Sequence, residues 1–388
     1  MTALLALSFG NIHNETLLWT MVHDLKVDPS CFRITYFNAP PNAPEPKLPP
    51  GVQSISWDVA KESVADGFET VIVQSLYKAN AAAILELEAC GLDWRRLCII
   101  ITDDEVDLWN EHVSKHKALS VGPTPGIDAA VLHVLERVER FFCLRHPYGD
   151  ILERLLGRPL QISDAMLMRR LVPDPDQYSV LTGEIREEIG ALQNKASRVN
   201  ILLLTKPMAY DRFRDYARDL LRFALFSRSR RNVTIYYWDR RKPWPFLARL
   251  EFAAILAIIR WVSPVIGKRG GPDVRVRNLP SLTRHEYMMA LLRCHALLGQ
   301  KRSGGGAINE ALKWGQVVML PEGSFNNAVR HEALGLPILH RQTNAISEIV
   351  EAVPDDLSAQ SEADEFVAAK DRMLRAFREF FPNLVYRD

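Results

Sequence analysis

The chain has 388 residues, of which 47% are hydrophobic and 24% charged, and its formal net charge is +1. This length suits two domains with a hydrophobic core each, and the composition is typical of a soluble globular protein. A net charge so close to zero argues against bulk electrostatic capture of nucleic acid. The five cysteines are scattered without metal-binding spacing, and the start, MTALLALSFGN, has no basic region of a signal peptide. We therefore expect reduced thiols and a cytoplasmic protein.

The first half of the chain alternates strand and helix patterns. Strands are expected at Leu4–Phe9, Phe32–Phe37, Val52–Trp57, Thr70–Gln74, Leu97–Thr102 and Pro159–Ser163. Helices are expected at Glu15–Lys26, Ala79–Cys90 and 128–145. The strand at 97–102 is almost continuously apolar, which is typical of a parallel sheet covered on both faces. Residues 1–172 are therefore predicted to form a doubly wound, Rossmann-like α/β domain.

A change of composition marks the end of this domain. Residues 172–178, VPDPDQY, combine two prolines with acidic residues, and a polar helix is expected at 180–196, so 173–198 is interpreted as a connector. The alternation then starts again. Strands are expected at Val199–Leu204, Val233–Trp238, Val274–Arg277, Gln316–Pro321 and Pro337–Leu339, and helices at Tyr210–Phe226, Pro245–Val262, Thr283–Leu298, Ile346–Ala352 and Glu362–Phe381. Residues 199–388 are predicted to form a second Rossmann-like domain, and the pattern leaves open whether the last helix crosses back to the first.

The most informative segment is KRSGGGAINEALKWGQVVMLPE, residues 301–322. Three successive glycines, Gly304 to Gly306, let the backbone approach an anion without a Cβ, and a helix starting near Ala307 points free N–H groups at that anion. Glu310 falls at the end of the first turn, where a carboxylate reaches a ribose or sugar hydroxyl. Gly315 is expected to end the helix. The alternative is an ordinary turn with glycines for tight packing, but their entropic cost favours a nucleotide-type ligand.

Two tandem doubly wound domains with this motif late in the second resemble the GT-B glycosyltransferases. The segment Ser303–Pro321 is similar to the family's donor motif, especially in the transferase that completes lipid II and in the nonhydrolysing sugar-nucleotide epimerases. The preceding NLPSLTRHEYMMALLRCHALLGQ is similar to the stretch that brackets the base. A wider resemblance, to bacterial lipid-linked Fuc4NAc transferases, rests on GNIHNETLLWTMVHDL and TDDEVDLW. These resemblances imply two Rossmann-like domains with a cleft between them, the donor on the second and the acceptor on the first.

The resemblance also implies roles for residues of the donor site. Glu310 would hold the ribose, and the glycine loop would face the diphosphate. Lys206 at the end of a strand, and Arg302 or Lys301 in the loop, are candidates to offset the diphosphate charge. The complete predicted donor site is Lys206, Arg302, Ser303, Gly304, Gly305, Gly306, Asn309 and Glu310. Arg302 also stands where retaining members carry a second glutamate, which favours an inverting branch of the family.

An inverting transferase needs a general base for the acceptor hydroxyl. His13, in the loop after the first strand, is one candidate, and the alternative is that His13 and Asn14 cap a helix. Asp103 and Asp104 are the rival, since they follow a central strand where open α/β sheets bind ligands. The alternative for these aspartates is a solvated acidic turn. No metal site is predicted, because His112 and His116 are flanked by lysines and are interpreted as a solvated surface.

Residues 206–242 carry eleven Lys or Arg against four Asp, interleaved with aromatic residues. An apolar helix follows, so residues 206–262 are a candidate surface for the inner membrane and a polyprenyl-diphosphate acceptor, with a solvated basic face as the alternative. We therefore expect an inverting, metal-independent glycosyltransferase that needs no cofactor beyond its nucleotide-sugar donor. Its acceptor would be a cell-envelope glycan or a lipid-linked glycan. Two alternatives stay open: a sugar-nucleotide epimerase of the same fold, and a noncatalytic binding module.

Overall fold

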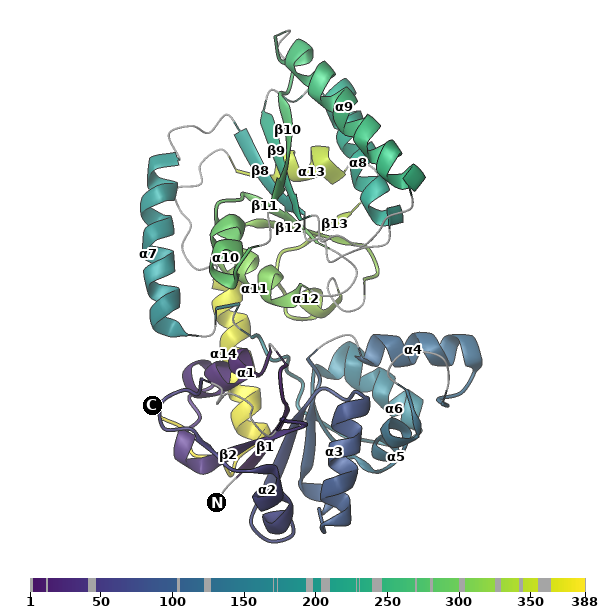
Figure 1. Cartoon of the computed structure of the whole chain (residues 1–388), viewed down its shortest axis with the longest axis vertical. Helices are drawn as coiled ribbons and strands as arrows, with labels where there is room; N and C mark the ends of the chain where they lie inside the picture. The colour runs from purple at the N-terminus through teal and green to yellow at the C-terminus, as the bar shows by residue number, and fades with distance from the viewer. Residues whose placement is uncertain are drawn as a thin grey trace. The chain divides into compact units, whose positions relative to one another are not determined.

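A computed structural model describes residues 3–11, 13–40, 47–102, 105–121, 127–169, 171–172, 174–192, 198–203, 210–227, 229, 231–238, 246–268, 271–279, 282–299, 304–324, 329–341, 345–354 and 364–387. The chain folds into two compact units (Figure 1). The first contains Met1–Pro173 and Ala368–Asp388, and the second is Asp174–Val367.

The first unit is built on a parallel sheet of seven strands. They are β1 (Ala3–Ser8), β2 (Phe32–Phe37), β3 (Gln53–Ser54), β4 (Thr70–Gln74), β5 (Leu97–Ile100), β6 (Arg140–Phe142) and β7 (Gln161–Ile162). The order β3-β2-β1-β4-β5-β6-β7 reverses direction between β1 and β4, which defines a doubly wound sheet. The central strands β4 and β5 are fully buried, because each carries apolar side chains toward both faces.

Helices connect these strands. They are α1 (His13–Trp19) with a π-helical turn at Thr20–Asp24, α2 (Trp57–Ser63), α3 (Lys78–Ala89), α4 (Glu105–His116), α5 (Ala129–Arg137) and α6 (Asp150–Leu156). The last helix, α14 (Asp364–Phe380), ends in this unit. There the rings of Phe142 and Phe377 meet edge to face, 5.1 Å apart, and Lys370 pairs with the buried carboxylate of Asp24 at 3.1 Å. The end of the chain thus completes the core of the first unit.

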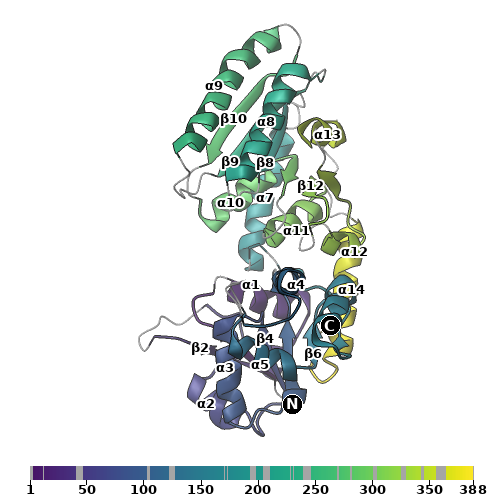
Figure 2. The same ribbon diagram turned by 90° about the vertical axis from the view of Figure 1, so that its right-hand side faces the viewer.

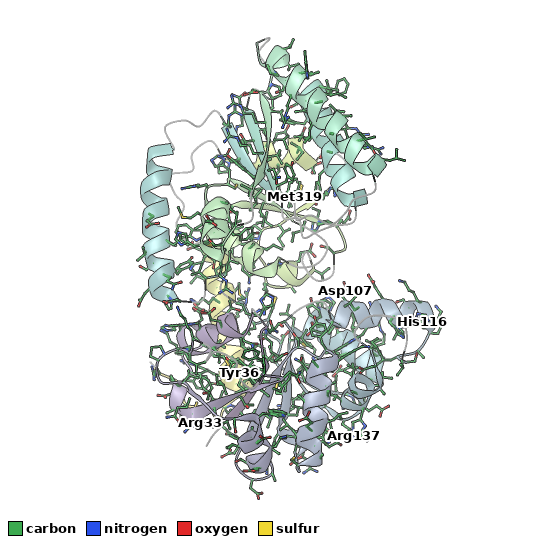
Figure 3. All side chains as sticks on the ribbon, viewed as in Figure 1. Arg33, Tyr36, Asp107, His116, Arg137 and Met319 are labelled. Carbon is green, nitrogen blue, oxygen red and sulfur yellow. The ribbon has the colours of Figure 1, made fainter. Side chains whose placement is uncertain are left out.

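The second unit contains a parallel sheet of six strands in the order β10-β9-β8-β11-β12-β13. The strands are β8 (Arg198–Leu203), β9 (Asn232–Trp238), β10 (Val274–Leu279), β11 (Ala296–Leu298), β12 (Val317–Pro321) and β13 (Leu339–Arg341). The helices are α7 (Pro175–Leu192), α8 (Tyr210–Phe226), α9 (Phe246–Lys268), α10 (Arg284–Leu292), α11 (Gly305–Lys313), α12 (Arg330–Ala333) and α13 (Ala345–Ala352). Apolar side chains of α8, α9 and α13 pack with the sheet in one core, which includes Met319 of β12 (Figure 3).

The structure corrects several sequence-based predictions. The predicted helix 128–145 ends at Arg137, and residues 140–142, with Phe141 and Phe142 buried, form β6. Likewise the predicted helix 283–298 ends at Leu292, and residues 296–298 form β11. Both errors have one cause, since two or three buried apolar residues are too few to show strand alternation and they extend a neighbouring helical pattern. The predicted strand 52–57 shrinks to β3, because the side chain of Ser56 caps α2 by accepting from the amide of Val59 at 3.2 Å.

The domain boundaries also differ from the predicted ones. Residues 174–192 belong to the second unit, because α7 lies beside α10 (Figure 2), so 173–198 is not a separate connector. Residues 368–388 belong to the first unit, so of the two possibilities that the sequence left open for the last helix, its return to the first domain is the one observed. Among the described residues, no helix has both the length and the apolar character needed to cross a membrane.

Candidate functional site

The glycine segment lies at the point where the second sheet reverses its strand order. Strands β8 and β11 are neighbours at the centre of the sheet, although β9 and β10 separate them in the chain. Open parallel sheets of this kind bind ligands at the carboxyl ends of the two strands that flank the reversal. The glycine segment connects the carboxyl end of β11 to α11. Its position in the fold is therefore that of a ligand-binding loop.

The described part of the glycine segment has the geometry of an anion-binding turn. Gly304 precedes α11 with φ = 82°, a backbone conformation that side chains with a Cβ rarely adopt. Gly305 and Gly306 form the first helical turn together with Ala307. The amides of a first turn have no acceptor within their own helix, and the helix dipole adds partial positive charge there. This turn can accept a phosphate, and Gly315 (φ = 66°) follows the end of the helix as predicted.

Glu310 is held by a chain of hydrogen bonds that reaches α7. Its carboxylate is buried, with 4% of the residue exposed, and Oε2 accepts from the hydroxyl of Tyr178 at 3.1 Å. The same hydroxyl lies 3.1 Å from Nε1 of Trp314. Because an indole N–H can only donate, the Tyr178 hydroxyl accepts from Trp314 and directs its own hydrogen to Glu310. These hydrogen bonds fix the orientation of the Glu310 carboxylate.

Two further contacts shape the surroundings of α11. Nζ of Lys313 lies 4.5 Å from the centre of the Tyr178 ring, a cation–π contact that keeps the ring in place. Asn309 is buried, and its Oδ1 lies 3.1 Å from Nε2 of the fully buried His331. The Asn309 side chain therefore stabilises the packing of α12 on α11, and its predicted role in donor binding gains no support from this contact. The sequence analysis did not predict the role of Tyr178, because this residue lies more than a hundred residues before Glu310.

Several predicted site residues lie outside the described residues. These are Lys206, Arg302 and Ser303 of the donor site and the base candidates Asp103 and Asp104. The neighbouring Glu105 is described and begins α4 with 1% of the residue exposed. The carboxylate residue that directly follows the two aspartates is therefore buried inside the fold.

His13 is the first residue of α1 and is half-buried. Its amide donates to Oδ1 of Asn11 at 2.9 Å, so Asn11 caps the helix. The side chain of Asn14 instead donates to the carbonyl of Ser8 at 2.7 Å and ties α1 to the end of β1. The alternative that His13 and Asn14 cap the helix is therefore wrong, and His13 lies just past the carboxyl end of β1, where that sheet reverses its strand order.

A polar network that the sequence analysis missed lies at the same edge of the first sheet. The hydroxyls of Ser75 and Thr102 are 2.6 Å apart, after β4 and β5. Asn80 Nδ2 donates to the carbonyls of Gln74 and Ser75 at 2.6 and 3.0 Å. Within the described part of the chain, the side-chain oxygens of Gln74 and Asn14 are buried without a hydrogen-bond partner. A buried acceptor without a donor costs about 1–3 kcal/mol, which a ligand hydroxyl or a water molecule would relieve.

The interpretation of His112 and His116 as a solvated pair is wrong for His112. That residue is buried, with 2% exposed, whereas His116 is exposed at the end of α4 (Figure 3). The two rings lie 4.4 Å apart. Over the described ranges, no group of three or more His, Cys, Asp or Glu side chains has an arrangement that would hold a metal ion.

No protein-family model matches the chain, and no curated protein matches it in sequence. Solved structures do share its fold. The Escherichia coli trehalose-6-phosphate structure bound with UDP-2-fluoro glucose aligns with 99% of this chain and 100% of its own, at 10% identity and a TM-score of 0.56. The UDP-GlcNAc 2-epimerase from Methanocaldococcus jannaschii aligns over 98% and 100%, at 11% identity and a TM-score of 0.53.

A putative UDP-N-acetylglucosamine 2-epimerase from Listeria monocytogenes is similar to a comparable degree. It aligns with 98% of this chain and 97% of its own, at 15% identity and a TM-score of 0.54. These likenesses show that the chain has the two-domain GT-B fold, with two Rossmann-like domains, as the sequence predicted.

Proposed function

We propose that the protein is a glycosyltransferase that moves a sugar from a nucleotide-diphosphate sugar to a cell-envelope polysaccharide or a lipid-linked acceptor. The observation that carries this proposal is that Gly304 and Glu310 both lie on α11 or directly before it, at the point where the second sheet reverses its strand order. The backbone amides after Gly304 suit a diphosphate. The buried, oriented carboxylate of Glu310 suits a ribose hydroxyl, because a charge-assisted hydrogen bond is stronger than a neutral one.

The acceptor chemistry is proposed for the first unit. Sugar transfer in one displacement requires a base that removes the acceptor proton and a site that offsets the leaving diphosphate. His13, Asp103 and Asp104 are the proposed bases, and the buried oxygens of Asn14 and Gln74 are proposed acceptors for glycan hydroxyls. Lys206, Arg302 and Ser303 are proposed to assist the glycine turn at the diphosphate. Inversion at the anomeric carbon is proposed because Arg302 replaces the second glutamate of the retaining branch.

The first experiment identifies the nucleotide. Thermal unfolding is measured with UDP, GDP, TDP and CMP, and a nucleotide at one hundred times its Kd stabilises a folded protein by about 2.7 kcal/mol. Glu310→Gln is expected to weaken the stabilising nucleotide about tenfold, since it removes a charged acceptor. Glu136→Gln is the matched control, because Glu136 is exposed on α5 of the first unit. If none of these nucleotides binds, the proposal is wrong.

The second experiment separates transfer from epimerisation, which is the alternative because UDP-GlcNAc 2-epimerases are among the proteins of similar fold. UDP-GlcNAc is incubated without an acceptor. Formation of the 2-epimer would identify an epimerase, whereas a transferase leaves the donor intact until a glycan acceptor is added. Product formation unaffected by replacing Glu310 together with His13, Asp103 and Asp104 would show that this site does not perform the chemistry.

A further inference from the structure

Helix α9 carries an exposed apolar stripe along most of its length. Leu247, Leu250, Ile258, Trp261 and Val265 are exposed by 77, 50, 43, 82 and 52%. At 3.6 residues per turn these five positions fall within an arc of about 80°, and at 1.5 Å per residue they extend over about 27 Å. The other side of the helix is buried against α8 and the sheet through Ile255 and Ile259 (Figure 1). A helix that is apolar on both sides requires an apolar environment on both.

An arginine-lined hollow borders this helix. Its volume is about 680 Å³, and Arg260 of α9 lines it together with Arg275 and Arg277 of the edge strand β10. The hollow also contains Asp273, which is paired with Arg275 at 2.9 Å and with Arg198. Arg260 and Arg277 are exposed and form no ion pair within the part of the chain that is described. Their guanidinium groups suit phosphate oxygens, which they contact with two parallel hydrogen bonds.

The basic residues of the chain are concentrated in the sequence segment that contains this helix. Residues 206–279 contain seventeen Lys or Arg and six Asp or Glu, which leaves 31 basic and 41 acidic residues elsewhere. A segment with a net charge of +11 therefore balances a remainder of −10. Such a segment attracts an anionic surface, and like charge opposes the approach of the same segment from a second copy of the chain.

We propose that α9 docks on the surface of an anionic lipid bilayer. The stripe from Leu247 to Val265 enters the interface between headgroups and acyl chains, with the indole of Trp261 at the headgroup level. Arg260 and Arg277 contact lipid phosphates beside it. The helix lies in the plane of the membrane, because Glu251 and Arg260 interrupt its apolar sequence. This docking requires no sugar substrate and is independent of the proposed glycosyl transfer.

The test measures binding of the full chain to phosphatidylcholine vesicles with and without phosphatidylglycerol, by co-sedimentation. Binding is expected only with the anionic lipid and is expected to weaken with salt, since salt screens surface charge. Leu247→Ala with Trp261→Ala is expected to lower binding at least tenfold, and Arg260→Gln about fivefold. The matched controls are Val180→Ala on α7, where Val180 is 62% exposed, and Arg95→Gln in the first unit.

Absence of vesicle binding, or equal binding by the stripe variant and the controls, would overturn the proposal. Size-exclusion chromatography of the stripe variant provides the second readout. A change from dimer to monomer, without vesicle binding by the unaltered chain, would assign the stripe to contacts between copies. Because nucleotide binding is measured separately, absence of vesicle binding does not contradict the proposed glycosyl transfer. Absence of nucleotide binding likewise does not contradict the proposed docking on lipid.

Discussion

Replacing Tyr178 with phenylalanine tests whether α7 orients the carboxylate of Glu310. The change removes one hydroxyl, which donates to Glu310 and lies 3.1 Å from the indole N–H of Trp314. A hydrogen bond to a charged group contributes about 1.5–3 kcal/mol and a neutral one about 0.5–1.5 kcal/mol. Because Tyr178 is half-buried, water can replace part of the lost hydrogen bonding in the variant. We therefore expect the free energy of unfolding to fall by about 1–2 kcal/mol.

The effect on nucleotide binding separates orientation from packing. A carboxylate that has lost about 1 kcal/mol of orienting interaction should bind the nucleotide about fivefold more weakly. We expect Tyr178→Phe and Glu310→Gln to be non-additive in a double-mutant cycle, by about 1 kcal/mol. The assay is titration calorimetry with the stabilising nucleotide. Tyr386→Phe is the control, because its hydroxyl donates to the carbonyl of Phe381 at 2.9 Å in the first unit.

If Tyr178→Phe binds the nucleotide as tightly as the unaltered chain, Tyr178 does not orient Glu310 for binding. The same conclusion follows if the two single losses add in the double variant. If the unaltered chain binds no nucleotide, the proposed function fails, but the cycle still measures the coupling between Tyr178 and Glu310 through unfolding free energies.

Three further predictions follow from the same structure. Gly304→Val is expected to abolish stabilisation by the nucleotide and to lower the free energy of unfolding by at least about 1 kcal/mol, because Gly304 has φ = 82°. The control is Gly183→Ala on α7, where a Cβ meets open space, and it should not affect nucleotide binding. Gln74→Leu removes a buried oxygen without a partner, so the free energy of unfolding should change by no more than about 1 kcal/mol. The KM for the acceptor should rise, and the KM for the donor should not. Equal changes in the two KM values would exclude a role of Gln74 in acceptor binding. Burial lowers the pKa of His295 to about 4, and its Nδ1 accepts from the amide of Asn200 at 2.8 Å. The unfolded chain therefore takes up this proton near pH 6.5, before the folded one, and stability should fall by about 3 kcal/mol as the pH drops from 6.5 to 4. Chemical denaturation across this range should show a shallower dependence for His295→Asn, and an unchanged slope would contradict the assignment.

The alternation of apolar runs was enough to predict a parallel α/β sheet in each half of the chain. Long elements such as α8 and the fully buried β4 match their predicted ranges, because their patterns extend over many residues. The short strands β6 and β11 were not predicted, since a three-residue strand with two or three apolar side chains next to a helix shows no period of its own. The sequence left open whether the last helix returns to the first unit, because this depends on which core Phe377 enters and not on local composition.

The candidate site was predictable only where its residues are consecutive. Gly304 and Glu310 lie on one loop and one helix, so their spacing is visible in the sequence. The contact between Tyr178 and Glu310, and the network of Gln74, Ser75 and Thr102, join elements that are distant in the chain. Such contacts depend on strand order and on the angles between packed helices, which the sequence pattern does not encode.

The division of the chain has a consequence for its synthesis. The second unit is continuous, whereas the first is completed by residues after 367, as in the contact from Arg140 to the carbonyl of Phe380, 240 residues apart in the chain. A growing chain therefore finishes the second unit before the first. Until α14 is made, β6 presents Phe142 without its aromatic partners Phe377 and Phe381, and this edge of the nascent protein is where we expect a chaperone or an aggregating neighbour to bind first.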